Sequence, residues 1–318
     1  MELVVCICTH NRAAYVRDCL DGLARQTVAR DRFDILIVDS GSAPSAAAEL
    51  CVLAAQYRTR LLRVDLPGVS AARNAGAWSA RARYIAYIDD DAIPAPDWVE
   101  NILHAVNQPG RRAAVIGGRI LPKWEAPLPA WWPASLRGVL SIIEYEGQGE
   151  YRGADLPPTL EPYGANMIVH VLSLLAAGGF SGSAGRSGRA LLSDEDVQLA
   201  WSLQDQGYSV RYDSRIVVQH QIQAGRLNPD WLLERLYWQG ASTVLTRHVL
   251  RQSDLVWREL PRRVVVAALC APLALLPRRS TRLLGARWRF AYAAGFVRAA
   301  VGWGMPRPAE HERVALSA

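Results

Sequence analysis

Three consecutive aspartates, Asp89, Asp90 and Asp91, directly follow the strand-like segment "RYIAYI". Adjacent like charges repel one another unless a cation or a set of donors offsets them. Carboxylate oxygens are the ligands that Mg²⁺ and Mn²⁺ prefer, and these metals are typically held by one or two carboxylates plus substrate phosphates. The alternative is a capped turn in which Asp91 or Asp97 opens the next helix. The cluster favours a cation site that also holds phosphate.

A second acidic cluster, Asp194, Glu195 and Asp196, opens the predicted helix "SDEDVQLAWSLQDQGY" after a glycine-rich loop. Negative charge is favourable at a helix N-terminus, so capping is one interpretation. A general base is the other interpretation, because a carboxylate that opens a helix beside a glycine-rich loop can accept a proton. His220 ends the segment "RIVVQH" and is either a structural histidine or a further metal ligand.

The stretch "PGVSAARNAG" places Arg73 and Asn74 in the first turn of a predicted helix. Such a turn offers backbone N–H groups and a cation to phosphates or to a base. Neither GxGxxG nor GxxxxGK[ST] occurs in the chain, which removes the usual dinucleotide and P-loop interpretations.

The elements that must position these groups alternate between strand and helix in the first third of the chain. "ELVVCICT", "FDILIVDSGS", "RLLRVDL" and "RYIAYI" are predicted strands, separated by segments of helical periodicity. Repeated βαβ order predicts an open, mostly parallel sheet with helices on both faces. Ligands of such sheets bind beyond the carboxyl ends of the strands, where residues 9–12, 39–42 and 89–91 fall.

Composition bounds the remaining function classes. The chain has 318 residues, 50% of them apolar, and a net charge of +6. Residues 261–318 carry ten arginines against two glutamates, so the positive excess is confined to the C-terminal segment and argues against a general nucleic-acid surface. Five cysteines without a CxxC pair fit a reduced, cytosolic protein. No signal peptide is recognisable, and the longest apolar run, residues 264–277, is too short to span a membrane.

The ordered motifs "CTHNR", "VDSGS", "PGVSAARNAG", "YIDDDA", "YGANM", "SDEDVQLAWSLQDQGY" and "VVQH" resemble the family 2 glycosyltransferases of GT-A fold. The resemblance covers residues 1–225 and rests on order and spacing. It implies a GT-A type, Rossmann-like catalytic domain with a mixed, mostly parallel sheet. Residues 1–118 would form its nucleotide-binding half and residues 119–225 its acceptor-binding half. Residues 226–318 would form a basic, helical, membrane-associating extension.

The resemblance also implies a role for each site residue. The nucleotide-sugar contacts would be Thr9, Asn11, Arg12, Asp39, Arg73, Asn74, Asp89 and Asp90. Asp91 and His220 would hold a divalent metal, Mn²⁺ or Mg²⁺. Asp196 would be the catalytic base and Glu195 its supporting neighbour. Acceptor contacts would come from Trp124, Trp131, Trp132 and Asn166.

The expected activity is inverting transfer of a sugar from a nucleoside-diphosphate donor, with UDP as the expected carrier. The acceptor would be a saccharide or a lipid-linked molecule of a bacterial polysaccharide or glycolipid pathway. The expected location is the cytoplasmic face of the cell membrane, with peripheral membrane contact, no nucleic-acid partner and no readable oligomeric state. Ser40 and the "IVHV" that follows "GANM" depart from the family's usual residues. The alternatives are a non-catalytic nucleotide-sugar or membrane-surface binding protein, a phosphotransferase with an aspartate nucleophile, and a nucleotidyltransferase. The phosphotransferase is disfavoured because its aspartate nucleophile normally ends the first strand, whereas these aspartates end a later one. The nucleotidyltransferase is disfavoured because its glycine-rich N-terminal loop is missing.

Overall fold

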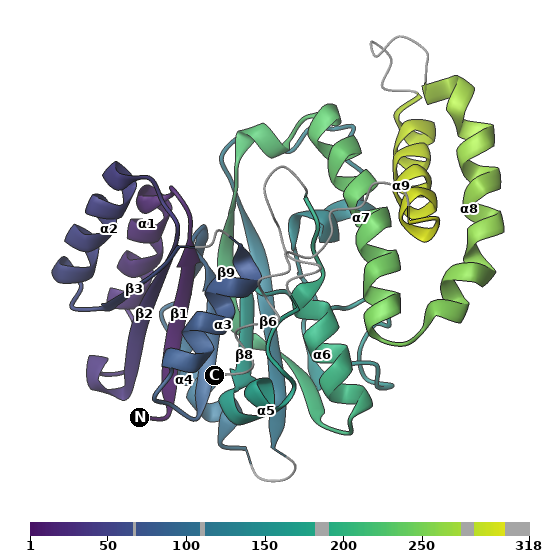
Figure 1. Cartoon of the computed structure of the whole chain (residues 1–318). Coiled ribbons are helices and arrows are strands. Elements are labelled where there is room, and N and C mark those ends of the chain that lie inside the picture. Colours follow the sequence, from purple (N-terminus) through teal and green to yellow (C-terminus); the bar gives the residue numbers. More distant parts are fainter. Residues whose placement is uncertain (66–67, 109–111, 182–190, 275–282, 303–318) are drawn as a thin grey trace. The chain divides into compact units, whose positions relative to one another are not determined.

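The computed structural model describes residues 1–65, 68–108, 112–181, 191–274 and 283–302 (Figure 1). Two compact units divide the chain. Unit 1 comprises Met1–Glu125, Ala134–Phe180 and Leu199–Ile222, and unit 2 comprises Ala126–Pro133, Ser181–Gln198 and Gln223–Ala318.

Four parallel strands form one half of the unit 1 sheet, in the spatial order β3-β2-β1-β4. Their bounds are β1 Leu3–Thr9, β2 Phe33–Ser40, β3 Arg60–Val64 and β4 Tyr84–Asp89. The central strands are nearly continuous apolar runs because both of their faces are buried. The predicted βαβ order of this region is confirmed.

The other half of the sheet is mixed. Strand β8 pairs antiparallel with both β4 and β6, β6 and β9 pair in parallel, and two short strands pair antiparallel with β9. The bounds are β5 Ala92–Pro94, β6 Ala113–Trp124, β7 Gln148–Glu150, β8 Asn166–His170 and β9 Ser209–Ile222. The last strand was predicted to end at His220, but its pairing with β6 continues to Ile222.

Helices pack against these strands at positions that match the predicted apolar periodicity. Those of unit 1 are α1 Ala13–Ala24, α2 Pro44–Gln56, α3 Val69–Ser79, α4 Trp98–Val106 and α5 Val171–Ala176. Helix α6, Glu195–Asp205, begins in unit 2 and ends in unit 1. Gly207, at φ +87°, follows its end in the left-handed conformation that favours glycine. Short 3₁₀ helices with described bounds are η1 Arg30–Arg32, η2 Ala134–Leu140 and η3 Ala224–Arg226.

Unit 2 is built on α7 Pro229–Val249, α8 Ser253–Ala274 and α9 Leu284–Ala300. Their common core contains Val244, Val256 and Phe296. A Cβ atom at Gly295 would lie 1.8 Å from the Tyr237 carbonyl oxygen, so glycine is what lets α7 and α9 approach so closely.

A partly buried charge network ties the same three helices together. Arg247 of α7 and Arg263 of α8 both donate to the Glu259 carboxylate, and Arg263 also lies over the rings of Tyr292 and Phe296 on α9. The described part of the C-terminal segment is therefore helical and well packed. Among the described helices, none is both long and apolar enough to cross a membrane.

Candidate functional site

The carboxyl ends of three neighbouring strands bring the predicted polar clusters to one edge of the sheet. In the parallel register, Thr9 of β1 lies beside Asp39 of β2, and Cys8 of β1 lies beside Asp89 of β4. The sequence interpretation of this edge as the site is consistent with that geometry, because the polar residues follow strand ends that lie side by side.

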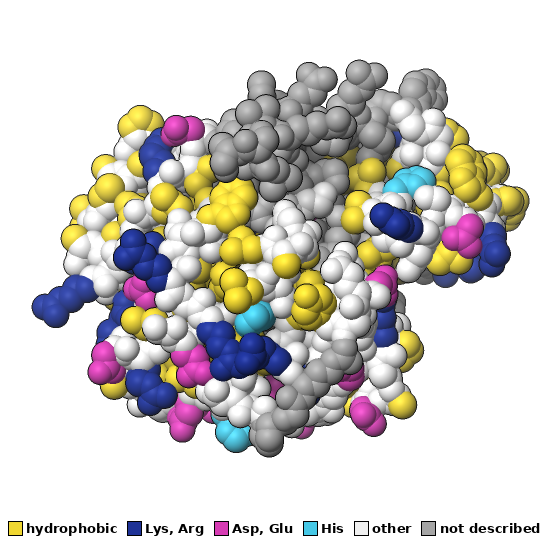
Figure 2. All heavy atoms as spheres, turned by 60° about the horizontal axis from the view of Figure 1, so that its bottom comes forward, with side chains coloured by type: hydrophobic (Ala, Val, Ile, Leu, Met, Phe, Trp, Pro, Cys, Tyr) yellow, Lys and Arg dark blue, Asp and Glu magenta, His cyan; other side chains and the backbone are white. Residues whose placement is uncertain are grey.

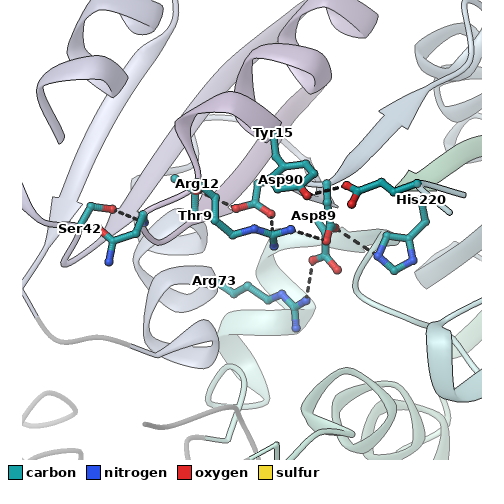
Figure 3. Close-up of polar contacts among 11 residues, drawn as sticks. Thr9, Arg12, Tyr15, Ser42, Arg73, Asp89, Asp90 and His220 are labelled. Carbon is teal, nitrogen blue, oxygen red and sulfur yellow. Dashed lines mark hydrogen bonds and ion pairs between the residues drawn. The ribbon is translucent and has the colours of Figure 1, made fainter. Parts of the chain in front are cut away.

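Arg12 explains how two of the three aspartates are tolerated. Its Nη1 donates to Asp90 Oδ1 and its Nη2 to Asp91 Oδ2, each at 2.7 Å. Figure 3 shows the Arg12 side chain directed at Asp90. Thr9 Oγ1 donates to the other oxygen of Asp90 at 2.7 Å. Burial raises the pKa of Asp90 to about 7, although the Arg12 charge opposes the rise, and the adjacent Asp91 adds to it. The aspartates therefore meet a planar cation from the β1–α1 turn, an arrangement that capping does not explain.

Asp91 also meets His220, because β5 follows the aspartates directly and pairs with β9, with Ala92 opposite His220. Asp91 Oδ1 lies 3.2 Å from His220 Nε2, and both side chains are almost fully buried. His220 Nδ1 lies 3.0 Å from the Leu140 carbonyl oxygen. A carbonyl can only accept, so Nδ1 carries a proton and Nε2 is left to face the carboxylate.

This pair fits a divalent metal. In a neutral ring, the lone pair of Nε2 would face the lone pairs of the Asp91 carboxylate and be repelled by them. The close approach is favourable if Nε2 carries a proton, or if Nε2 and Asp91 Oδ1 both bind the same cation. Adjacent ligands of an octahedral metal lie roughly 3.0 Å apart when the metal–ligand distances are about 2.1 Å. The carbonyl on Nδ1 is the usual second partner of a metal-binding imidazole. Among the described residues, however, no group of three or more His, Cys, Asp or Glu side chains gathers that could hold a metal. Phosphate and water oxygens would have to complete the coordination.

Asp89 lies at the open side of the cluster, with its side chain partly exposed. Arg73 of α3 points toward it, with Nη2 3.4 Å from Asp89 Oδ1, and the guanidinium packs over the Phe180 ring at 5.4 Å. A Cβ atom at Gly164 would lie 2.1 Å from Arg73 Nη2. The glycine of the "YGANM" motif therefore makes room for this arginine, a role that the sequence alone did not reveal.

Asp39 and Asn11 organise the loop after β2. The buried Asp39 accepts from the Ser42 backbone N–H at 3.0 Å and from Arg63 Nη1 at 3.1 Å. Asn11, at φ +57°, accepts from the Ala43 N–H at 2.7 Å. Ser42 belongs to the predicted polar cluster 39–42, whereas Arg63 was not singled out from the sequence and only its contacts identify it.

Asn74, Asn166 and Tyr15 of unit 1 make contacts within the protein that define their roles. Asn74 bonds the Phe180 backbone with both ends of its amide, at 2.8 and 2.9 Å, so it holds that segment in place. Asn166 is fully buried and bonds the Trp98 side chain and the carbonyl oxygens of Arg119 and Ile216. Tyr15, which the sequence did not single out, lies under the Arg12 guanidinium at 4.4 Å and donates to Glu125.

The second acidic cluster belongs to unit 2 at the start of α6. Glu195 and Asp196 are both buried in the first turn, and Asp196 Oδ1 accepts from the Val197 N–H at 2.8 Å. Asp194 adopts φ +80° and accepts from Gln239 Nε2 with both oxygens, at 3.1 and 2.9 Å. A helix of unit 2, α7, thus holds the turn that carries the predicted base.

The predicted acceptor aromatics are divided between the two units. Trp131 and Trp132 of unit 2 have ring centroids 5.5 Å apart, and Trp132 also lies 6.5 Å from Trp231 of α7. Trp124 ends strand β6 in unit 1. The stacked set in unit 2 is therefore Trp131, Trp132 and Trp231, the last of which the sequence did not single out.

Comparison with known proteins finds the model of the family described as Glycosyl transferase family 2 over residues 4–147. Glucosyl-dolichyl phosphate glucuronosyltransferase of Haloferax volcanii is 30% identical over 55% of this chain and 54% of its own length. Pre-mycofactocin glycosyltransferase of Mycobacterium tuberculosis is 26% identical over 76% of this chain and 48% of its own length. The chain thus spans about half the length of these curated relatives.

Solved structures share the fold. The mannosyltransferase PcManGT of Pyrobaculum calidifontis, in complex with GDP-Man and Mn²⁺, matches with a TM-score of 0.62 and 17% identity over 94% of this chain and 86% of its own. S. aureus TarS 1-349, in complex with UDP, matches with a TM-score of 0.54 and 13% identity over 95% of this chain and 92% of its own. The mixed, Rossmann-like GT-A architecture is confirmed.

Proposed function

We propose that the chain is a family 2, metal-dependent, inverting glycosyltransferase that uses a nucleoside-diphosphate sugar, with UDP as the expected carrier; the family match over residues 4–147 supports this proposal. The observation that carries the proposal is the buried Asp91–His220 pair at the carboxyl edge of the sheet, with Nδ1 of the histidine fixed as a donor. A structural neighbour that holds a nucleotide sugar and Mn²⁺ supports the same assignment.

On the donor side, Asp91 and His220 would hold the metal, which when bound would neutralise charge on the diphosphate leaving group. Arg73 and the partly exposed Asp89 lie at the same edge, and we expect them to contact the phosphates and the ribose. The nucleoside side of the site is built by residues that contact the nucleoside or position the backbone and side chains around it. These are Thr9, Asn11, Arg12, Asp39, Asn74 and Asp90.

On the acceptor side, Asp196 takes the proton of the acceptor hydroxyl. The hydroxyl oxygen forms a bond to the anomeric carbon while the bond from that carbon to the diphosphate breaks, so the configuration inverts. Glu195 supports the base at the N-terminus of α6, where the helix dipole favours negative charge. Metal binding and proton acceptance require separate carboxylates, because oxygens that bind the metal cannot also accept the proton of the acceptor hydroxyl.

The proposed acceptor is a saccharide or a lipid-linked sugar of a bacterial polysaccharide or glycolipid pathway. The name of the Haloferax relative, which refers to a dolichyl phosphate, supports a lipid-linked acceptor. Trp131 and Trp132, with Trp231, offer an aromatic stack on which a sugar can pack. The activity would then take place at the cytoplasmic face of the membrane.

The test is thermal stability with UDP, GDP, dTDP and CDP, each with and without Mn²⁺. A ligand at a hundred times its Kd stabilises the native state by about 2.7 kcal/mol, so a true nucleotide is readily detected. We expect one nucleotide to act with metal, Asp91→Asn and His220→Gln to abolish the metal-dependent part, and the exposed Asp254→Asn to behave as wild type. Absence of any shift in wild type would overturn the proposal.

Turnover separates the enzyme from a binding protein. Asp196→Asn should keep the nucleotide shift and lower sugar transfer, or donor hydrolysis, by about 10²–10⁴-fold. If nucleotide binds but wild type shows neither transfer nor hydrolysis with any acceptor, the chain is a nucleotide-sugar binding protein.

A further inference from the structure

Helix α8 carries an apolar face that the described part of the protein leaves exposed. Val264, Val265, Leu269 and Leu273 are all exposed, with Leu269 at 71%. These positions, together with the exposed Ala268 and Pro272, recur about every four residues and therefore lie along one side of the helix. We call this side the α8 outer face. Figure 2 shows apolar side chains gathered at the right edge of the molecule, where Figure 1 draws α8.

The opposite side of α8 already has a packing role. Val256 is fully buried in the core that α7, α8 and α9 share, and Glu259 and Arg263 belong to the charge network described above. The helix therefore does not need its outer face for the fold of unit 2. A contiguous apolar surface without a folding role marks an interaction surface.

Charge along the same side of the helix indicates the kind of partner. Trp257, Arg258 and Arg262 are exposed in the first half of α8 and precede the apolar half. The one acidic residue on this side, Asp254, lies 3.8 Å from Arg258. Apolar residues with neighbouring arginines and a tryptophan are typical of a helix that lies in the interface of an anionic bilayer. A parallel pairing with a second copy of the same face would instead bring arginines toward arginines, and self-association is tested separately below.

We propose that the α8 outer face inserts into the head-group region of a bilayer that contains anionic lipid, with Arg258 and Arg262 contacting the lipid phosphates. This inference deepens the proposed function, since it names the surface that would bring the enzyme to a lipid-linked acceptor. Membrane binding and nucleotide binding are measured separately, so failure of one is distinguishable from failure of the other.

The experiment measures binding of the full chain to vesicles by flotation, with phosphatidylglycerol and phosphatidylcholine mixtures compared with phosphatidylcholine alone. The double variant Val265→Asp with Leu269→Asp should lower binding to anionic vesicles at least tenfold. Its matched control is Val52→Asp with Leu172→Asp, which alters a valine and a leucine of similar exposure (64% and 70%, against 56% and 71%) in unit 1. The control should bind as wild type does.

A charge pair tests the lipid headgroup. Arg258→Gln with Arg262→Gln should weaken binding to anionic vesicles about 25-fold, because each basic side chain near such a surface contributes about fivefold. Arg17→Gln with Arg25→Gln, which removes one exposed arginine from α1 and another from the residue that caps its C-terminus, is the control. Added salt should reduce the wild-type binding in the same way.

Two controls keep the result interpretable. Every variant must retain its melting temperature and the metal-dependent nucleotide shift, which excludes unfolding as the cause. Sedimentation velocity without lipid tests self-association. The proposal is overturned if wild type does not bind anionic vesicles, if the matched control loses binding equally, or if the α8 double variant only converts an oligomer to a monomer.

Discussion

Asn166 illustrates how the structure separates a structural residue from a ligand contact. Trp98 Nε1 donates to its Oδ1 at 2.9 Å, and its Nδ2 donates to the carbonyl oxygens of Arg119 at 3.0 Å and Ile216 at 2.8 Å. The side chain is fully buried at the start of β8. These bonds join α4, β6, β8 and β9, so we expect Asn166 to matter for folding.

The perturbation is Asn166→Asp, which keeps the shape and the acceptor but replaces the donor by an oxygen that faces two carbonyls. A buried carboxylate in that position must be protonated in the folded state, so its pKa rises above the unfolded value of about 3.9. The folded state then binds more protons than the unfolded state, and stability falls as pH rises from about 4.

The magnitude follows from these two effects. One carbonyl loses its partner at every pH, which costs about 1–3 kcal/mol. Proton uptake adds about 1.4 kcal/mol for each pH unit above 4, so the loss relative to wild type should grow by about 3 kcal/mol between pH 5 and pH 7.

The assay is urea denaturation of variant and wild type at pH 5, 6 and 7, starting at pH 5 where the variant is most stable. Asn228→Asp is the control, because this exposed residue caps α7 through its oxygen and aspartate caps equally well. A loss below about 1 kcal/mol that does not change with pH would refute the structural role and return Asn166 to the acceptor contacts.

Three further predictions concern unit 2. Two arginines lower the pKa of Glu259 although burial opposes the shift, so their contribution to stability is complete above the unfolded pKa of about 4.3 and is lost as pH falls through the lower folded value. Glu259→Gln should therefore lower the free energy of unfolding by about 2 kcal/mol in urea denaturation at pH 7, and by progressively less below about pH 4. The exposed Glu234→Gln is the control and should change it little at either pH. A loss of stability in Glu259→Gln that does not depend on pH would contradict the assignment. Gly295→Ala should lower stability by about 2–3 kcal/mol in thermal denaturation, because its Cβ would overlap a carbonyl of α7. Gly285→Ala, near the start of the same helix, is the control, since its Cβ has room and the change should be neutral or stabilising. Equal effects of the two substitutions would refute the close approach of α7 and α9. Gln239→Leu releases the turn that carries the proposed base, so kcat of sugar transfer should fall about tenfold with the donor KM unchanged; a change in KM alone would assign Gln239 to donor binding instead.

The sequence by itself determined the parallel half of the sheet and the edge where the site lies. Apolar runs of strand length alternate with helical periodicity there, and the polar residues come directly after the runs. Because neighbouring parallel strands end at the same edge, local pattern was sufficient to bring Thr9, Asp39 and Asp89 together.

Only the tertiary structure decided which side chains meet across the chain. His220 lies beside Asp91 because β5 pairs with β9, and Arg12 bonds the aspartates because the β1–α1 turn lies beside the end of β4. The amides of Asn74 and Asn166 are directed at backbone groups that come from distant segments. The same holds for α8, whose sequence contains apolar residues all along its length and whose packing on α7 and α9 selects the side that stays exposed. Periodicity describes each segment alone, whereas these contacts depend on long-range pairing that no local pattern encodes.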